Sequence, residues 1–388
     1  MKKRMSLFLL IVVLASSNSP SSAADYYRLY YHGIFSGQPT SARATGMGLT
    51  TITLGGIENV VYNPASIGLE SQALNVYLNY ATGSQVNMGS KYGFFGASYR
   101  VNQKLVLGLS MQRWNVKDSP WTVIIGSYEE NEDKSSQLLY TLSGAYEVIP
   151  NLQVGFSGNY ILDKAVPGTV TNSEFIASLG ATYDKNVDWL KLKNLSNQKI
   201  RFAGSCVNLL MNNDIVVTYE EYKHYRELPS IFYLGTAYQG TLPFNPGFLN
   251  TSSFFGNAPK EVDLSLHLQY GNHFKDDYNT SFGLGAEALF VKMIAFRLGY
   301  YFEKRPQQQN EDGGFWATTN KKGLTFGYGV KVPVNELSHN KIPFDVDVDM
   351  VTFKVLNELN TKNYTQPKAF EGHNFLFAFG LKLRWVKS

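Results

Sequence analysis

Apolar and polar residues alternate with a period of two through most of the chain after residue 71, and this pattern predicts β-strands. Fourteen segments show it, and each is close to the length that a tilted strand needs to cross a membrane. The predicted strands are 72–82, 91–101, 104–114, 136–148, 151–163, 172–184, 199–210, 229–240, 261–271, 279–291, 294–304, 321–333, 341–351 and 373–385. The count is even, as a single-chain outer-membrane barrel requires. The sequence therefore predicts an all-β fold, a transmembrane antiparallel β-barrel of about 14 strands.

The connections between these strands alternate in length. Short ones lie at 102–103, 150–151, 292–293 and 335–340, and long ones lie at 115–135, 211–228, 305–320 and 352–372. Outer-membrane barrels have short periplasmic turns and longer extracellular loops, so we expect the short set in the periplasm. Two connections of periplasmic parity, 185–198 and 241–260, are long, which indicates either small periplasmic elements or a miscounted hairpin.

The segment 294–303 shows the expected two faces. Ile294, Phe296, Leu298, Tyr300 and Phe302 share one face, and Ala295, Arg297, Gly299, Tyr301 and Glu303 share the other. We expect the apolar face to contact lipid and the polar or small face to line the lumen. A soluble sandwich would show the same period with its apolar face inward, but fourteen strands without a disulfide would make an unusually large sandwich.

The segment Ser41–Leu69 interrupts this pattern. It is rich in glycine and small residues, and Gly46 and Gly48 would weaken a helix or a strand. A glycine-rich segment ahead of many alternating strands predicts a hatch in the lumen of the barrel. The alternative is an N-terminal lid packed on an ordinary β-domain.

The hatch ends in Asn63-Pro64-Ala65, which predicts a turn. Pro64 fixes its own φ and biases Asn63 to an extended conformation, while the Asn63 amide bonds nearby backbone. Since the segment has few large side chains, we expect the hatch to be held by this turn and by polar contacts in the lumen rather than by a core of its own.

The N-terminus has the features of a secretory signal. Met1–Arg4 carries three positive charges, Ser6–Ala15 is almost purely apolar, and small residues precede a predicted cleavage after Ala24. We therefore expect a signal peptide at 1–24, an N-terminal segment with the hatch at 25–70, and a barrel at 71–388 in the outer membrane of a Gram-negative bacterium.

Composition agrees with a membrane barrel. Charged residues make up 17% of the chain and aromatic residues 14%, whereas about a quarter of an ordinary soluble domain is charged. The net charge of +4 is too small to indicate a nucleic-acid partner. The single cysteine, Cys206, excludes an intramolecular disulfide.

The hatch also carries a resemblance to a known family. Ala42-Arg43-Ala44, Gly46-Met47-Gly48 and the stretch from Val61 to Ile67 resemble the N-terminal signature of the PorV/PorQ family, one of the FadL-like barrels. The resemblance implies a fourteen-stranded barrel with a hatch and no enzymatic activity. One departure is Leu54–Glu58, LGGIE, where many relatives have an acidic-acidic-alanine stretch.

The same resemblance implies two functions. PorV-like members serve type IX protein secretion, carrying secreted proteins by their C-terminal domains, whereas FadL-like members pass hydrophobic small molecules. We expect the first role, with outer-membrane lipid and secreted proteins as partners and no nucleic acid. Passage of hydrophobic molecules is the alternative, and a purely structural barrel is a third class.

Three carboxylates alternate with apolar residues in one predicted strand, at Asp345, Asp347 and Asp349. A column of carboxylates facing lipid would be prohibitively costly, so they should face the lumen. Cations of inward parity on neighbouring strands are Arg297, Lys331, Lys382 and Arg384. We favour a structural ladder of ion pairs over a polar binding wall.

No motif indicates a cofactor, a metal or a catalytic centre. The six histidines lack metal-type spacing. Gly46-Met47-Gly48 begins like a dinucleotide fingerprint, but Thr51 stands at the third glycine position and no βαβ unit surrounds it.

Overall fold

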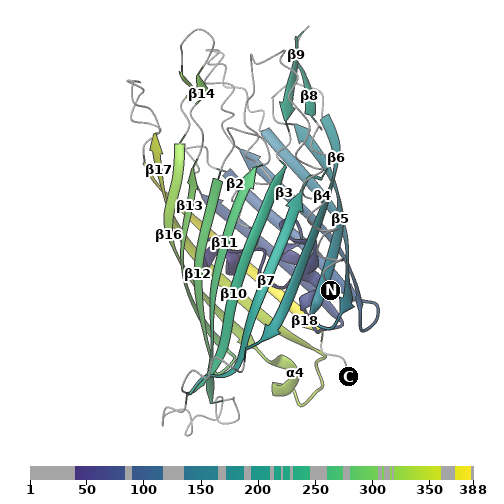
Figure 1. Cartoon of the computed structure of the whole chain (residues 1–388), viewed down its shortest axis with the longest axis vertical. Coiled ribbons are helices and arrows are strands. Elements are labelled where there is room, and N and C mark those ends of the chain that lie inside the picture. The colour runs from purple at the N-terminus through teal and green to yellow at the C-terminus, as the bar shows by residue number, and fades with distance from the viewer. Residues whose placement is uncertain are drawn as a thin grey trace, which may run out of the picture.

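The computed structural model describes residues 40–83, 90–116, 135–164, 172–187, 194–209, 214–219, 222–227, 230–244, 260–273, 280–304, 308–309, 315–316, 319–359 and 372–385. The predicted signal peptide and residues 25–39 lie outside the described residues. Figure 1 shows the chain as one barrel of tilted strands.

Fourteen antiparallel strands close into a single barrel, in the order β1-β18-β17-β16-β13-β12-β11-β10-β7-β6-β5-β4-β3-β2. The strands are β1 (Leu74–Gly83), β2 (Ser90–Arg100), β3 (Leu105–Val116), β4 (Ser135–Ile149), β5 (Leu152–Lys164), β6 (Asn172–Asn186), β7 (Ser196–Val207), β10 (Ile231–Pro243), β11 (Glu261–His273), β12 (Thr280–Phe290), β13 (Ile294–Lys304), β16 (Thr319–Val332), β17 (Phe344–Leu359) and β18 (Gly372–Trp385). The predicted fold class and all fourteen predicted strands are confirmed. Most boundaries differ by one to three residues, and the largest error is at β17, which continues past residue 351 to Leu359 and takes part of the predicted loop 352–372.

Apolar side chains cover the outside of the barrel. On β13, Phe296 and Leu298 are 57% and 50% exposed, whereas Ala295 and Arg297 are buried on the lumen side. The predicted faces of this strand are confirmed. An apolar exterior that surrounds the whole barrel faces lipid in a barrel that crosses a membrane. Among the described residues, no helix is both long and apolar enough to span a bilayer.

The two ends of the barrel differ in the length of their connections. We call the end with the short turns, such as 150–151 and 291–293, the inner end, and the opposite end the outer end. The long inner connections join β6 to β7 and β10 to β11. In both cases no other barrel strand lies between the two strands. The predicted parity therefore holds without a missed hairpin in the described part of the chain.

Small elements decorate both ends. The outer connections contain two short hairpins, β8 (Asp214–Tyr219) with β9 (Tyr222–Glu227) and β14 (Gln308–Gln309) with β15 (Phe315–Trp316). A one-turn helix, α4 (Val334–Leu337), lies at the inner end between β16 and β17.

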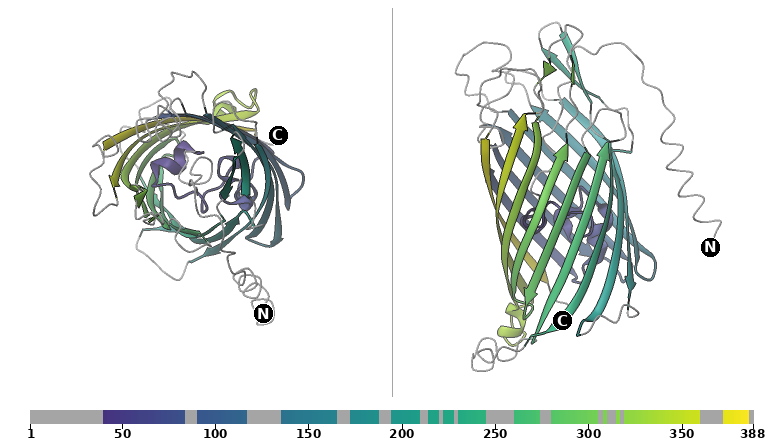
Figure 2. Two further views of the ribbon diagram at one scale, coloured as in Figure 1. Left: turned by 90° about the horizontal axis from the view of Figure 1, so that it is seen from above. Right: turned by 60° about the vertical axis from the view of Figure 1, so that its left-hand side comes forward.

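The hatch lies inside the barrel, as the view along the barrel in Figure 2 shows. It consists of a short helix α2 (Ala42–Gly46) and two 3-10 helices, η1 (Ile57–Asn59) and η2 (Pro64–Leu69). The prediction that this segment fits no helix is thus wrong for α2, where the Ser41 side chain caps the helix by accepting from the Ala44 N–H at 3.1 Å. The predicted placement of the hatch in the lumen is confirmed.

Candidate functional site: the lumen and its hatch

The hatch touches the wall through glycines on both sides of the contact. Gly46 packs on Gly327 of β16, where a Cβ on Gly46 would lie 3.1 Å from the Gly327 Cα. Gly48 has φ +67°, and a Cβ there would overlap the backbone oxygens of Tyr300 and Leu284. Only glycine combines this left-handed backbone with so close an approach. The hatch therefore fits the wall backbone to backbone.

The predicted turn Asn63-Pro64-Ala65 fixes the C-terminal part of the hatch, at η2. Asn63 caps η2, since its Oδ1 accepts from the Ala65 N–H at 3.0 Å, and its Nδ2 donates to the Ile52 carbonyl at 2.9 Å. Pro64 occupies the first position of η2, where its missing N–H costs nothing. A Cβ on Gly155 of β5 would overlap Pro64 and Ala65, so the wall leaves room for the turn there.

A chain of four charged groups ties α2 to the wall. Arg43 of the hatch donates to Glu287 of β12 at 2.5 and 3.0 Å. Glu287 also accepts from Arg297 of β13 at 2.6 Å, and Arg297 pairs with Asp349 of β17 at 2.8 Å. Each charge in this buried chain contacts an opposite charge, which is the condition for burying such groups at moderate cost.

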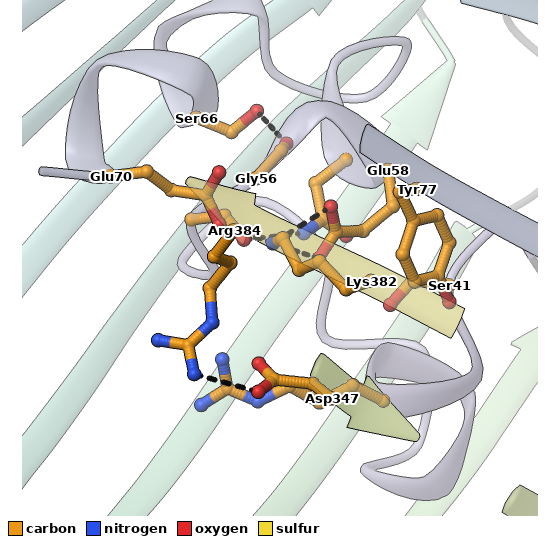
Figure 3. Close-up of polar contacts among 12 residues, drawn as sticks. Ser41, Gly56, Glu58, Ser66, Glu70, Tyr77, Asp347, Lys382 and Arg384 are labelled. Carbon is orange, nitrogen blue, oxygen red and sulfur yellow. Dashed lines mark hydrogen bonds and ion pairs between the residues drawn. The ribbon is translucent and has the colours of Figure 1, made fainter. Parts of the chain in front are cut away.

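A second charged cluster ties the end of the hatch to the last strand, as Figure 3 shows. The Lys382 amine of β18 donates to both carboxylate oxygens of Glu58, at 2.9 and 3.1 Å, and also to Glu70. Beside it, Arg384 pairs with Asp347 at 2.7 Å. Lys382 thus bridges two acids of the hatch segment.

Burial and ion pairing shift the pKa values of two charged groups of the hatch, Glu58 and Arg43. Burial raises the pKa of Glu58 above its ordinary value, although Lys382 pulls it in the opposite direction. Burial alone would lower the pKa of Arg43, but Glu287 outweighs it and the pKa rises. Arg43 is therefore charged at every working pH, while Glu58 takes up a proton more readily than an ordinary carboxyl.

The middle of the hatch is held by wall side chains. The Gln269 Oε1 of β11 accepts from the Thr51 N–H at 2.7 Å and from the Ile52 N–H at 3.0 Å. Thr53 contacts His267 through its hydroxyl at 2.8 Å, and its carbonyl accepts from Arg201 at 2.9 Å. Both ends and the middle of the hatch therefore have their own wall partners.

Most of the predicted ladder residues lie together, but in a different arrangement. Asp347 and Asp349 pair with Arg384 and Arg297, whereas Asp345 accepts from the backbone N–H of Asn335 at 3.2 Å. Lys331 lies opposite Asp347 in the register of β16 and β17. The charged groups form two clusters that bind the hatch, rather than one column along the wall.

The sequence analysis missed the acids that complete these clusters, Glu58, Glu70 and Glu287. Glu58 belongs to the LGGIE departure, and Glu287 has the same parity as Gly283 and Gly285, which face the hatch. An isolated charge of inward parity in an otherwise small and apolar strand was the signal that could have found Glu287.

On the outer side of the hatch the lumen has an apolar lining. Its members face inward between the hatch and the outer ends of their strands, are buried, and belong to one hydrophobic cluster. We call this set the outer lining: Tyr92, Phe94, Leu139, Ile161, Ile176, Val207, Ile231, Tyr233 and Tyr301. Tyr62 of the hatch joins it by an edge contact with Tyr233, with ring centroids 5.9 Å apart.

Several polar groups near the outer lining bond to each other. The Tyr301 hydroxyl donates to Glu303 at 2.6 Å, the Thr141 hydroxyl to Asn159 at 2.8 Å, and the Asn159 amide to Ser178 at 3.2 Å. The expectation that the inward face is polar or small holds only in part for the outer half of the lumen, since large apolar residues point inward there among polar ones such as Gln112, Asn159 and Ser178.

Comparison with known proteins identifies the fold. No family model and no curated protein matches the chain. Among solved structures, a monoaromatic hydrocarbon channel, the TodX deltaS2S3 mutant, is similar over 89% of this chain and 99% of its own, with 10% identity and a TM-score of 0.50. A FadL homologue from Pseudomonas aeruginosa covers 89% of this chain and 98% of its own, with 10% identity and a TM-score of 0.48. At such identity the likeness shows a shared barrel fold, and the resemblance to PorV/PorQ stays a prediction.

Proposed function

We propose that the chain is an outer-membrane channel that takes up small apolar molecules into the outer lining and passes them beyond the hatch. The observation that carries this proposal is the outer lining, a set of buried apolar side chains on the outer side of the hatch. Barrels that conduct polar solutes have water-filled, polar interiors. An apolar pocket with a few polar groups is instead what an apolar ligand requires.

The fold supports the same choice between the two predicted functions. The similar solved barrel is described as a channel for monoaromatic hydrocarbons, which fits an apolar lining. The role in type IX secretion, with secreted proteins as partners, rests on the hatch motif and on long outer loops. Those loops lie largely outside the described residues, so that role stays a prediction and passage of apolar solutes is preferred.

Binding of ethylbenzene to the protein in lipid nanodiscs tests the proposal, with empty nanodiscs subtracted. We expect saturable binding that weakens by at least about tenfold when Ile161 and Ile176 are both replaced by Gln, because each loses an apolar contact with the ligand. Val106→Gln is the matched control, since Val106 is also buried and inward-facing but lies two residues nearer the inner end than Gly108, which contacts Ile57 of the hatch.

Leakage of a polar solute from vesicles that contain the protein is the second measurement. The hatch should keep a small sugar such as arabinose from leaking out. Free passage of arabinose, or ethylbenzene binding no greater than that of empty nanodiscs, would exclude the proposed function. Capture of secreted proteins by their C-terminal domains would favour the secretion role instead.

A further inference from the structure

Two tyrosine–glutamine pairs join neighbouring strands. One lies toward the inner end, where Tyr238 has the outward parity of the exposed Leu234, and the other faces the lumen toward the outer end. At the inner end, the Tyr238 hydroxyl donates to the Gln198 Oε1 at 2.7 Å, and the Gln198 Nε2 donates to the Leu195 carbonyl at 3.0 Å. Both ends of that amide are satisfied. This pair shows what a purely structural tyrosine–glutamine contact looks like in this wall.

The outer pair is only half satisfied. The Tyr92 hydroxyl of β2 donates to the Gln112 Oε1 of β3 at 2.8 Å. The Gln112 side chain is buried at 1% exposure, and no acceptor among the described residues lies within reach of its Nε2. Since nearly all buried amide donors in proteins have a partner, this donor is available to an acceptor that is not part of the described chain.

The surroundings of this donor are apolar. In the strand register, Gln112 lies between Phe94 of β2 and Leu139 of β4, both members of the outer lining. Ser110, two residues nearer the hatch on the same face of β3, has a buried hydroxyl that also lacks a partner. An amide donor between apolar neighbours and a hydroxyl between Gly96 and Thr141 thus follow one another along one face of β3.

This arrangement discriminates between classes of apolar molecule. A pure hydrocarbon would cover the Gln112 amide and leave it without an acceptor, which is unfavourable. A neutral molecule with an apolar body and one accepting oxygen would fill the lining and satisfy the donor together. Sites with a buried donor of this kind reject analogues that lack the acceptor.

We propose that Gln112 is a specificity-determining residue whose Nε2 binds the carbonyl oxygen of an apolar ketone, aldehyde or ester, with Ser110 as a second polar contact. This inference rests on the proposed function and names the ligand class for the same lumen. Hydrocarbons still bind in the outer lining, and the carbonyl adds a preference.

Acetophenone and ethylbenzene are the probes, because they share one carbon skeleton and differ by the carbonyl oxygen. The measured quantity is the ratio of their dissociation constants on the protein in nanodiscs. In Gln112→Met, which keeps the size of the side chain but removes the donor, we expect the ratio to shift about fivefold to tenfold against acetophenone. Part of the shift should appear as tighter binding of ethylbenzene, which no longer covers an amide without an acceptor.

The control is Gln198→Met, the same substitution in the satisfied pair, and it should leave the ratio unchanged. In Gln112→Met the Tyr92 hydroxyl loses its acceptor. The double variant Tyr92→Phe/Gln112→Met also removes that hydroxyl and should give the same shift. The faster migration of unheated samples on gels shows that each variant is folded, and if the single variant fails this check, the double variant carries the test.

The outcomes separate this inference from the proposed function. An unchanged ratio in folded Gln112 variants, with ethylbenzene still bound by the wild type, overturns the role of Gln112 and leaves the channel proposal standing. It would mean that only water occupies the donor. Absence of ethylbenzene binding to the wild type removes the proposed function and this inference with it.

Discussion

The inner and outer halves of the lumen differ in the side chains that they present. Toward the inner end, charged groups such as Arg43, Glu287 and Lys382 join the hatch to the wall in specific pairs. Toward the outer end, large apolar side chains such as Ile161 and Ile176 line the lumen. Ion pairs fix a single geometry, whereas apolar contacts tolerate different partners. The inner half therefore anchors the hatch, and the outer half is suited to receive a ligand.

The largest expected effect lies in the inner half. Glu287→Leu removes the acid between Arg43 and Arg297, which leaves Arg43 without its counter-charge and Arg297 with Asp349 alone. We expect the free energy of unfolding to fall by about 3–5 kcal/mol. Urea unfolding of the protein in lipid bilayers measures it.

Ile161→Val provides the matching measurement in the outer half. It removes one methylene from the outer lining, and the expected loss is about 0.5–1.5 kcal/mol. Equal losses for Glu287→Leu and Ile161→Val would contradict the division into an anchoring half and a receiving half.

An effect smaller than that of Glu287→Leu is expected where the hatch meets the wall by backbone alone. Gly48→Ala places a Cβ against the Tyr300 and Leu284 backbone at a positive φ, which costs about 1–3 kcal/mol. The hatch should shift while the barrel stays closed, so arabinose should leak from vesicles although the folded gel band is kept.

Gly93→Ala is the control for that prediction, because a Cβ on Gly93 of β2 would meet nothing within 4 Å. It should leave the vesicles tight. Leakage from Gly93→Ala, or tight vesicles with folded Gly48→Ala, would show that the glycine contact does not seal the lumen.

The smallest effect concerns pH. Because burial raises the pKa of Glu58, the folded protein holds its proton more strongly than the unfolded chain does. The stabilisation that results is present below the ordinary carboxyl pKa and is lost as pH rises through the raised one. Relative to Glu58→Gln, the wild type should therefore lose stability as pH rises from 4 to 7, measured by urea unfolding at both values. A relative gain over that interval would contradict the direction of the shift.

The sequence predicted the barrel well because its signal is local. One strand such as β13 shows its two faces within ten residues, and the alternation repeats around the wall. The turn at Asn63-Pro64 was equally accessible, because proline and a capping side chain act on their own neighbours. The five-residue helix α2 was missed because its stability comes from a wall that the local sequence does not contain.

The lumen was harder to predict, for two physical reasons. Glu287 and Arg43 are 244 residues apart, and only the path of the hatch through the barrel brings them together. The outer lining was missed because Ile161 and Ile176 face inward on strands whose outward residues are apolar too. Where both faces are apolar, a two-residue period loses its contrast and cannot assign the inner face.

The position of Lys382 links closure of the barrel to the seating of the hatch. Glu58 and Glu70 precede β1, the first strand to be synthesised, and Lys382 lies on β18, the last, which pairs with β1 to close the barrel. The bridge between them forms only when the seam closes over a seated hatch. A barrel that closed without its hatch would leave Lys382 facing the open lumen and would lose this bridge. Closure of the seam between β1 and β18 is therefore favoured when the hatch is already seated.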